Sequence, residues 1–394
     1  MEQVLYQLPD GWSWRKLSEL AKTTSGGTPS RSNKDYWGGS IPWVKSGELG
    51  DSRVEKNEEF ITELGLKNSS AKLFPKESLL LALYGATAGK LGVLTYDATT
   101  NQAVCCISQD DQLLARDFLR YYLLSQRKKI IEDSFGGAQP NISQAYVREI
   151  DIPTPPLTEQ KRIVEKLDVL LTRINTAIEH LHSKLDLSKQ LFDSILDEFF
   201  KRSDCDSVPL TEVVDFIGGS QPPKSQFSDV QKEGYVRLIQ IRDYKTDNHI
   251  VYVDSASTKK FCTKEDVMIG RYGPPVFQIL RGLDGAYNVA LMKAVPNEDV
   301  LTKNYLFWFL QSPSIQNYVI GISQRAAGQS GVNKKALEKY LIPVPSKTIQ
   351  NDIVDKVGQL VNKSRNLEAE VTAEITILNQ LKASILDSAF KGEL

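Results

Sequence analysis

The chain has 394 residues, of which 41% are hydrophobic and 25% are charged, and its formal net charge is −1 at pH 7. This length predicts two to three domains, and the composition is that of an ordinary globular protein whose near-neutral charge gives no sign of a nucleic-acid partner. No apolar run approaches the roughly 18 residues that a membrane helix needs, and the N-terminus lacks a signal-peptide pattern, so we expect a cytoplasmic protein.

Residues 1–150 are predicted to form a first α/β domain. Short β-like runs such as "SLLLALYG" alternate with Gly, Pro and Asn turns, and the aromatic stretch "RDFLRYYL" is typical of a short helix. The segment "GATAGK" at 85–90 resembles a phosphate-binding loop. However, its glycine spacing is one residue short, and Leu91 stands where that loop requires a hydroxyl. We therefore interpret it as a turn that leaves a strand.

Residues 151–203 are predicted to form a long helix that begins after a proline pair. Apolar residues recur every three or four positions from Ile163 to Leu185 and are followed by Phe192, Ile195 and Phe199. Sustained over roughly five heptads, this pattern is typical of a coiled coil. Some forty helical residues span on the order of 60 Å. Pro155 lies where a proline helps to start a helix, and Thr158 is the predicted N-cap.

Residues 204–340 and 341–394 repeat this order. "IPTPPLTEQKRIV" at 152–164 returns as "IPVPSKTIQNDIV" at 342–354, with Thr348 as its predicted N-cap, and "QLFDSILDEFFK" returns as "QLKASILDSAFK". The globular parts echo each other more loosely, as in "LSELAKTTSGGTPS" and "LTEVVDFIGGSQPP" or "TTNQAV" and "AYNVAL". We therefore predict an α+β protein: two α/β domains separated by two long helices that form an antiparallel coiled coil, with an internal pseudo-twofold repeat. Two unrelated helices in one core would not need matching starts and ends.

No catalytic constellation is present in the sequence. The four cysteines form no CxxC pair, and with three His in the chain a zinc site is not expected. There is no G-x-S-x-G, HExxH, dinucleotide-binding or amino-methyl-transfer motif, and residues 1–150 contain no His. We expect neither a catalytic residue nor a metal site in this chain.

Polar turns in both globular parts carry the groups that hydrogen-bond to base edges and phosphates. In the first part the predicted DNA contacts are Lys45, Ser46, Tyr84, Lys90, Asn101, Gln102, Gln139 and Asn141. In the second part they are Gln240, Arg242, Arg271, Tyr272, Asn288, Gln329, Lys334 and Lys335. Such residues also occupy ordinary surface loops, which is the alternative at each position.

Over essentially its whole length the chain resembles the specificity subunit of Type I restriction-modification systems. The resemblance is carried by "LPDGWSWRKLSELAKTTSGGTPSR", "DYWGGSIPWVKSGEL", "LLLALYGATAGKLGV", "TTNQAV" and above all "IPTPPLTEQKRIVEKLD". The second copy of the last segment departs from it, because Ser346-Lys347 replaces Pro-Leu and Ile349 replaces Glu.

The resemblance implies two target-recognition domains, at 1–150 and 204–340, and two coiled-coil helix regions, at 151–203 and 341–394. Each domain would read one half of a bipartite, asymmetric DNA target through the major groove, and the helices would set the gap. The implied partners are double-stranded DNA, two DNA methyltransferase subunits and restriction-translocase subunits. S-adenosylmethionine, ATP and Mg²⁺ would be held by those subunits and none by this chain. The alternative is a duplicated coiled-coil adaptor that binds proteins without DNA specificity.

Overall fold

The computed structural model describes residues 6–133, 141–201, 204–325 and 331–394. The chain divides into two compact units, of which unit 1 comprises Met1–His180 and Ala373–Leu394 and unit 2 comprises Leu181–Thr372. The predicted domains 1–150 and 204–340 each lie within one unit, whereas both helix regions are divided between the units. Within the described part of the chain, no helix is both long enough and apolar enough to cross a membrane.

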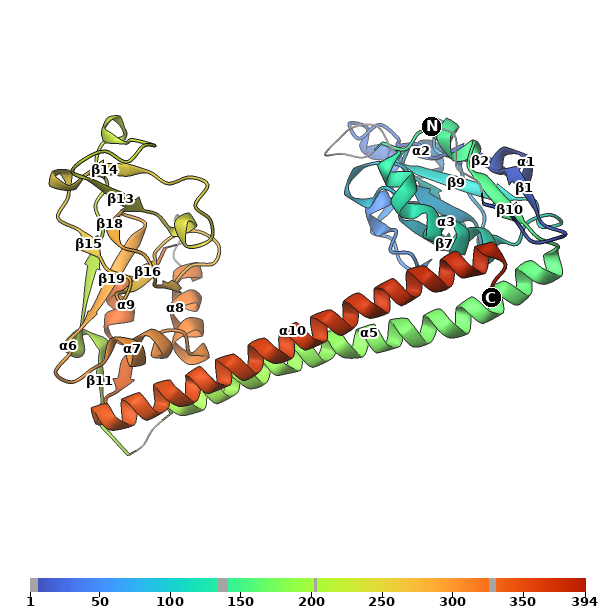
Figure 1. The fold of residues 1–394 in the computed structure, drawn as a ribbon. Helices are drawn as coiled ribbons and strands as arrows, with labels where there is room; N and C mark the ends of the chain where they lie inside the picture. The colour runs from blue at the N-terminus through green and yellow to red at the C-terminus, as the bar shows by residue number, and fades with distance from the viewer. Residues whose placement is uncertain (1–5, 134–140, 202–203, 326–330) are drawn as a thin grey trace. The chain divides into compact units, whose positions relative to one another are not determined.

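Unit 1 contains a five-stranded sheet in the order β2-β9-β6-β7-β4 and a three-stranded sheet in the order β5-β3-β8. Figure 1 labels β2, β7 and β9 of the larger sheet. Neighbouring strands are antiparallel except in the pairs β3–β8 and β4–β7, which are parallel. The strands are β2 (Ala21–Ser25), β3 (Trp37–Val44), β4 (Arg53–Val54), β5 (Glu59–Ile61), β6 (Leu79–Ala82), β7 (Leu91–Leu94), β8 (Thr99–Thr100) and β9 (Val104–Gln109). A separate antiparallel pair joins β1 (Ser13–Lys16) to β10 (Asp151–Thr154). The helices are α1 (Leu17–Leu20), α2 (Glu63–Lys67), α3 (Arg116–Glu132) and α4 (Gln144–Arg148), with 3₁₀ turns η1 (Lys34–Tyr36), η2 (Ser46–Glu48) and η3 (Gly85–Thr87).

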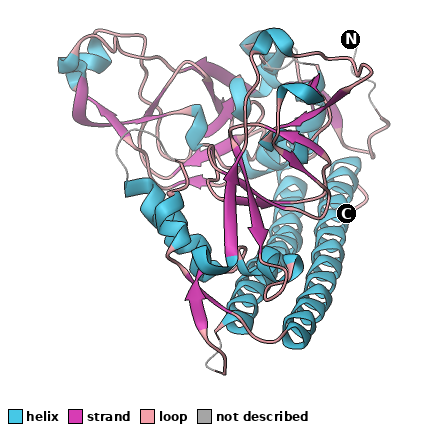
Figure 2. Ribbon diagram, turned by 90° about the vertical axis from the view of Figure 1, so that its left-hand side faces the viewer, coloured by secondary structure: helices cyan, strands magenta, loops and turns pink. Residues whose placement is uncertain are grey.

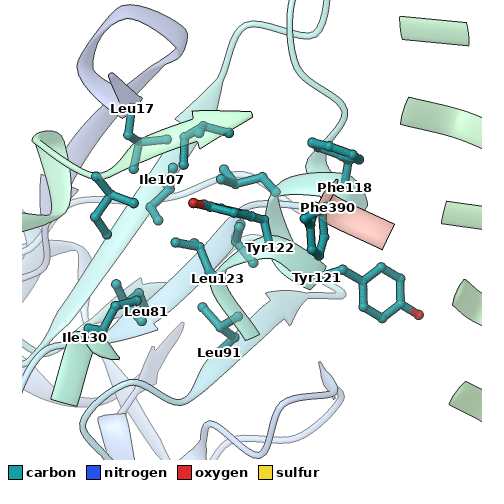
Figure 3. Packing of buried hydrophobic residues seen from close by; sticks show 14 of the residues in the cluster. Leu17, Leu81, Leu91, Ile107, Phe118, Tyr121, Tyr122, Leu123, Ile130 and Phe390 are labelled. Carbon is teal, nitrogen blue, oxygen red and sulfur yellow. The ribbon is translucent and has the colours of Figure 1, made fainter. Parts of the chain in front are cut away.

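The core of unit 1 lies between the larger sheet, α3 and the long helices. The sheet contributes β6, β7 and β9 side chains such as Leu81, Leu91 and Ile107, and α3 buries apolar residues at helical spacing (Figure 3). Phe390, near the end of the last helix, packs edge-on against Phe118 and Tyr122, with ring centroids 5.2 and 5.1 Å apart. The last helix therefore completes the core of the N-terminal domain.

Unit 2 contains two four-stranded sheets, in the orders β12-β19-β16-β17 and β14-β13-β18-β15. The strands are β12 (Val214–Gly218), β13 (Tyr235–Ile239), β14 (Tyr252–Asp254), β15 (Phe261–Cys262), β16 (Val267–Gly270), β17 (Gln278–Leu280), β18 (Gly285–Tyr287) and β19 (Leu291–Pro296). As in unit 1, a separate antiparallel pair joins β11 (Ser207–Pro209) to β20 (Leu341–Pro343). The helices are α6 (Leu210–Val213), α7 (Lys303–Phe309), α8 (Pro313–Arg325) and α9 (Lys334–Glu338), with 3₁₀ turns η4 (Lys224–Gln226), η5 (Ile241–Tyr244) and η6 (Ser255–Ser257). Phe200 packs on Tyr305 and Phe309 with ring centroids 5.2 and 5.5 Å apart. Phe390, the aligned residue in unit 1, makes the matching contacts with Phe118 and Tyr122.

The two long helices are α5 (Leu157–Phe200) and α10 (Lys347–Lys391). In unit 1 the first part of α5 and the last part of α10 lie side by side (Figures 1 and 2). Arg162 Nη2 donates to Leu394 O at 2.7 Å, and Lys382 Nζ donates to Asn175 Oδ1 at 2.9 Å. From Arg162 to Asn175 the residue numbers on α5 rise, while those of the bonded residues fall from Leu394 to Lys382. These two segments are therefore antiparallel. The predicted α+β fold with two domains and two long helices is confirmed.

A buried glutamine near the start of each long helix gives a physical reason for the repeated sequence at these two positions. Gln160 and Gln350 are both 0% exposed. Gln160 Oε1 accepts from Ala115 N at 2.8 Å, and its Nε2 donates to Leu113 O and Pro155 O, each at 2.9 Å. Gln350 makes the matching bonds to Thr302 N, Val300 O and Pro345 O at 2.8, 2.7 and 2.8 Å. Each amide ties a helix start to the chain segment before α3 or α7.

The predicted N-caps are wrong. Thr158 and Thr348 are each the second residue of their helix, because α5 begins at Leu157 and α10 at Lys347. The first backbone bonds of the α-helical i→i−4 type run from Gln160 N to Pro156 O and from Gln350 N to Ser346 O, at 3.0 and 2.9 Å. The helices therefore begin directly after the proline segments, without a threonine cap.

Candidate nucleic-acid interface

Four segments of unit 1 that are far apart in the sequence are joined by a row of backbone hydrogen bonds. Asn101 N donates to Val44 O at 3.1 Å, Leu83 N donates to Ala103 O at 2.7 Å, and Ile142 N donates to Leu83 O at 2.7 Å. The row places most predicted contacts of this unit on neighbouring segments: Lys45, Ser46, Tyr84, Asn101, Gln102 and Asn141.

Unit 2 contains the same row at the aligned positions. Asn288 N donates to Ile239 O at 3.1 Å, Arg271 N donates to Ala290 O at 2.8 Å, and Val332 N donates to Arg271 O at 2.9 Å. The predicted contacts that this row brings onto neighbouring segments are Gln240, Arg242, Arg271, Tyr272, Asn288, Lys334 and Lys335. The backbone of the candidate surface is therefore duplicated, while its side chains differ.

One glycine in each unit lets the chain pass directly over the row as it leaves β2 or β12. A Cβ on Gly26 would lie 2.1 Å from Thr100 Oγ1, and a Cβ on the aligned Gly219 would lie 2.0 Å from Asn288 O. Real Cβ atoms do not approach so closely, and the obstructing oxygen at Gly219 belongs to the backbone. This close approach is the physical reason for the shared glycines in "SGGT" and "IGGS".

A 3₁₀ turn with an acidic residue follows the strand at one end of each row. Glu48 Oε2 accepts from Lys45 N at 2.5 Å, and Asp243 Oδ2 accepts from Gln240 N at 3.0 Å. Asp243 is 4% exposed. Burial raises the pKa of its carboxyl, although the bond from Gln240 N and the nearby Arg237 and Arg242 act in the opposite direction. These carboxylates fix the backbone that presents Lys45 in one unit and Gln240 with Arg242 in the other.

The side chains of the predicted DNA contacts differ in how firmly neighbouring groups fix them and in how exposed they are. Lys45 Nζ lies 2.7 Å from Glu58 Oε2 and 3.2 Å from Glu59 Oε1, and these bonds raise the pKa of the lysine. The side chain of Arg242 is 51% exposed, and Arg271 stacks at 5.2 Å over the exposed Tyr272 ring. The backbone of Tyr272 forms an isolated antiparallel β-bridge with Gly331, and the backbone of Tyr84 forms the same kind of bridge with Asn141.

Other predicted contacts are placed less favourably for contact with a ligand. Asn288 is 8% exposed, and its Oδ1 accepts from Ala290 N at 3.1 Å, an arrangement that favours a role in shaping its own turn. Lys90 lies in the turn between β6 and β7, beyond the residues that form the row, and Gly89 N donates to Ala82 O at 2.9 Å within that turn. Gln139 and Gln329 lie outside the described residues.

Arg31, which lies in the loop that follows Gly26, was not among the predicted contacts. Its guanidinium carbon is 3.7 Å from the centroid of the Trp37 ring and 4.8 Å from that of Trp43, and it forms an ion pair with Glu59. No local pattern marks this arginine, because Glu59 is 28 residues further along the chain. The ion pair forms only once β3 and β5 are paired.

The chemistry of these surfaces is hydrogen bonding and ion pairing. Burial raises the pKa of Cys105 and of Cys262 to about 12, so these thiols stay protonated at neutral pH and are poor nucleophiles. A cavity of about 590 Å³ in unit 1 is lined by residues including Glu77, Arg116 and Lys161, and the predicted contacts do not line it.

Comparisons with known proteins agree with the duplicated organisation of the chain. A family model described as the Type I restriction modification DNA specificity domain matches the chain twice, at residues 9–185 and 202–376. The chain is 24% identical over 429 residues to the EcoKI specificity subunit of Escherichia coli (strain K12), covering 98% of this chain and 90% of that protein. It is 29% identical over 194 residues to the EcoR124I/EcoR124II specificity subunit of Escherichia coli, a match that spans 48% of each chain.

Two solved structures share the fold. A chain from work on complex assembly and conformational transition of the type I R-M system has a TM-score of 0.78 at 22% identity, covering 99% of this chain and 100% of that one. The HsdS subunit from Thermoanaerobacter tengcongensis has a TM-score of 0.54 at 21% identity, covering 100% of both chains.

Proposed function

Because the chain belongs to the Type I restriction modification DNA specificity family, we propose that its two domains read the two halves of a bipartite, asymmetric DNA target. The observation that carries this proposal is the duplicated row of hydrogen-bonded segments. One backbone arrangement presents Lys45, Gln102 and Asn141 in unit 1, but Gln240, Val289 and Gly331 at the aligned positions of unit 2. Similar scaffolds with unlike donors and acceptors suit two half-sites of different sequence.

The long helices set the gap between the half-sites in this proposal. α5 has 44 residues and α10 has 45, and each runs from one unit into the other without a break. At 1.5 Å per residue such a helix is about 65 Å long. The spacing matters because a shift of one base pair turns a half-site by roughly a tenth of a helical turn. Two readers in one chain also bind more tightly than either alone, since the second contact is intramolecular.

Two pairs of exposed apolar side chains on the long helices are the proposed docking points for two copies of one partner. Leu187 and Leu191 on α5 are 64% and 61% exposed, and the aligned Ile377 and Leu381 on α10 are 62% and 46% exposed. Residues four apart share one face of a helix, and exposed apolar groups of this kind favour a protein partner. We assign the two copies to DNA methyltransferase subunits, to which restriction-translocase subunits are added.

The chain itself is a non-catalytic subunit in this proposal. S-adenosylmethionine, ATP and Mg²⁺ are held by the partner subunits, and this chain holds no cofactor. The chemistry of the complex is adenine methylation and DNA cleavage, whereas the chain supplies the choice of target.

Mapping methylated adenines in cells with and without the gene tests the DNA function. We expect deletion to remove methylation at one gapped, asymmetric motif and at no other. An unchanged methylation map would instead favour the adaptor that binds proteins without DNA specificity.

Two double variants, Leu187→Ser with Leu191→Ser and Ile377→Ser with Leu381→Ser, test the docking points. Each should leave one methyltransferase copy in the purified complex, and the fourfold variant should leave none, as measured by light scattering. Val169→Ser is the matched control, since Val169 is 52% exposed and its aligned position holds Gln359. Two bound copies in every variant would contradict the assignment.

A further inference from the structure

The loop that carries Arg31 is fixed against the candidate interface of unit 1. Trp43 Nε1 donates to Gly27 O at 2.9 Å, and the hydroxyl of Thr28 bonds to the side chain of the predicted contact Gln102. Both anchors come immediately after Gly26, where the chain passes over the hydrogen-bonded row. The next residues of the loop therefore extend from a fixed point beside that row.

Arg31 is both ordered and accessible. Its guanidinium stacks on Trp37, whose Nε1 donates to Ser30 O at 3.1 Å, and Trp37 meets Trp43 edge-on with ring centroids 5.0 Å apart. The side chain of Arg31 nevertheless remains 54% exposed. An exposed arginine ordinarily loses rotamer freedom on binding, and one that is already stacked loses less.

A shared carboxylate couples Arg31 to a predicted DNA contact. Glu59 forms ion pairs with Arg31 and with Lys45, the latter at 3.2 Å. The hydrogen bond from Arg31 lowers the pKa of Glu59; burial acts in the opposite direction, and the bond from Lys45 lowers it further. The carboxylate therefore stays ionised at neutral pH and holds both cations beside the row.

We propose that Arg31 is a base-reading residue of unit 1 that recognises guanine, and that Glu59 and Trp37 are positioning residues that aim its guanidinium. The ion pair with Glu59 uses Nη1 of Arg31, and the planar fork of an arginine matches the O6 and N7 acceptors of guanine in the major groove. This inference rests on the proposed DNA function. Leu238 occupies the position aligned with Trp43, so the same stack is not repeated in unit 2 and the effect falls on one half-site.

The test is the methylation map of cells that carry Arg31→Ala or Arg31→Lys. Both variants should lower the preference for guanine at one position of one half-site by about tenfold, within the range expected for one bidentate contact. The other half-site should be unchanged. Lysine keeps the charge but lacks the fork, so a phosphate contact would tolerate it and a guanine contact would not. Trp37→Leu should relax the same position.

Arg53→Ala is the matched control. Arg53 is 51% exposed and pairs with the carboxylate of Glu77, so the variant removes the same charge from a similar surface site. It should leave the motif unchanged. Thermal unfolding of each purified full-length variant separates a folding defect from altered reading, since a purely structural role for Trp37 would lower the unfolding temperature without changing the motif.

Three results would overturn the inference. They are an unchanged motif in Arg31→Ala, a wild-type motif restored by Arg31→Lys, and an even loss of methylation over all sites. If the wild-type gene confers no methylated motif, the proposed function fails together with this inference. If the wild-type motif is present and Arg31→Ala retains it, this inference fails alone.

Discussion

Replacing Gln160 by alanine removes three hydrogen bonds at the start of α5. The substitution leaves Ala115 N and the buried Pro155 O without the partners that now lie at 2.8 and 2.9 Å. Leu113 O also loses its bond, but Leu113 is 36% exposed, so water can replace the amide there. Two unsatisfied groups at about 1–3 kcal/mol each predict a loss of about 2–6 kcal/mol in the free energy of unfolding of unit 1.

Urea unfolding combined with hydrogen exchange is the suitable assay, because exchange assigns the loss to a unit. The Ala115 amide and the first turns of α5 should lose protection in Gln160→Ala. Gln350→Ala should produce the same change at Thr302 and the start of α10. The control is Gln190→Ala, which changes an exposed glutamine on α5 and should alter stability by less than about 0.5 kcal/mol. A loss in Gln160→Ala no larger than in this control would refute the role of the buried amide.

Three further predictions concern packing, helix propensity and pH. Phe390→Ala should destabilise unit 1 by about 3–5 kcal/mol in urea unfolding, because it empties a site that is 2% exposed; a loss below about 1 kcal/mol would contradict the packing described. Gly358→Ala should stabilise α10 by about 0.5–1 kcal/mol, since nothing lies within 4 Å of the added Cβ, and a drop in stability would refute this. At Asp266 burial acts to raise the pKa, but the bond from Thr263 N and the ion pairs with Lys303 and Lys293 hold it below the usual value of 3.8. Stability from this carboxylate is therefore present above that value and lost as the pH falls through the folded pKa, so Asp266→Asn should flatten the acid limb of a plot of unfolding free energy against pH.

The long helices and the repeat were predictable because their signals are local. Apolar residues three and four positions apart on α5 and α10 face one side of a helix whatever else the chain does. The proline segments gave the helix starts within a few residues. The prediction that Thr158 and Thr348 are N-caps was wrong. The buried amides of Gln160 and Gln350 hold each helix start instead, and they bond to segments some 45 to 50 residues away in the sequence.

The candidate interface was only partly predictable, because it depends on pairing between distant segments. Polar residue types at turns pointed to Lys45, Gln102 and Tyr84, which the hydrogen-bonded row brings onto neighbouring segments. The same rule selected Asn288, whose amide is turned toward its own backbone, and residue type alone does not distinguish these cases. Arg31 was missed because its importance arises from Trp37 and Glu59, which meet it only in the folded domain.

The position of Phe390 bears on the order in which the chain matures during synthesis. Unit 2 is one continuous stretch, Leu181–Thr372, whereas unit 1 also needs Ala373–Leu394. At a translation rate of about 5–20 residues per second, the 190 residues between Phe200 and Phe390 take about 10–40 s to emerge. During that time the N-terminal domain lacks the ring that packs on Phe118 and Tyr122, and a nascent chain that stalls in α10 leaves that apolar site open to chaperones or proteases. The domain that is synthesised first is the one that is finished last.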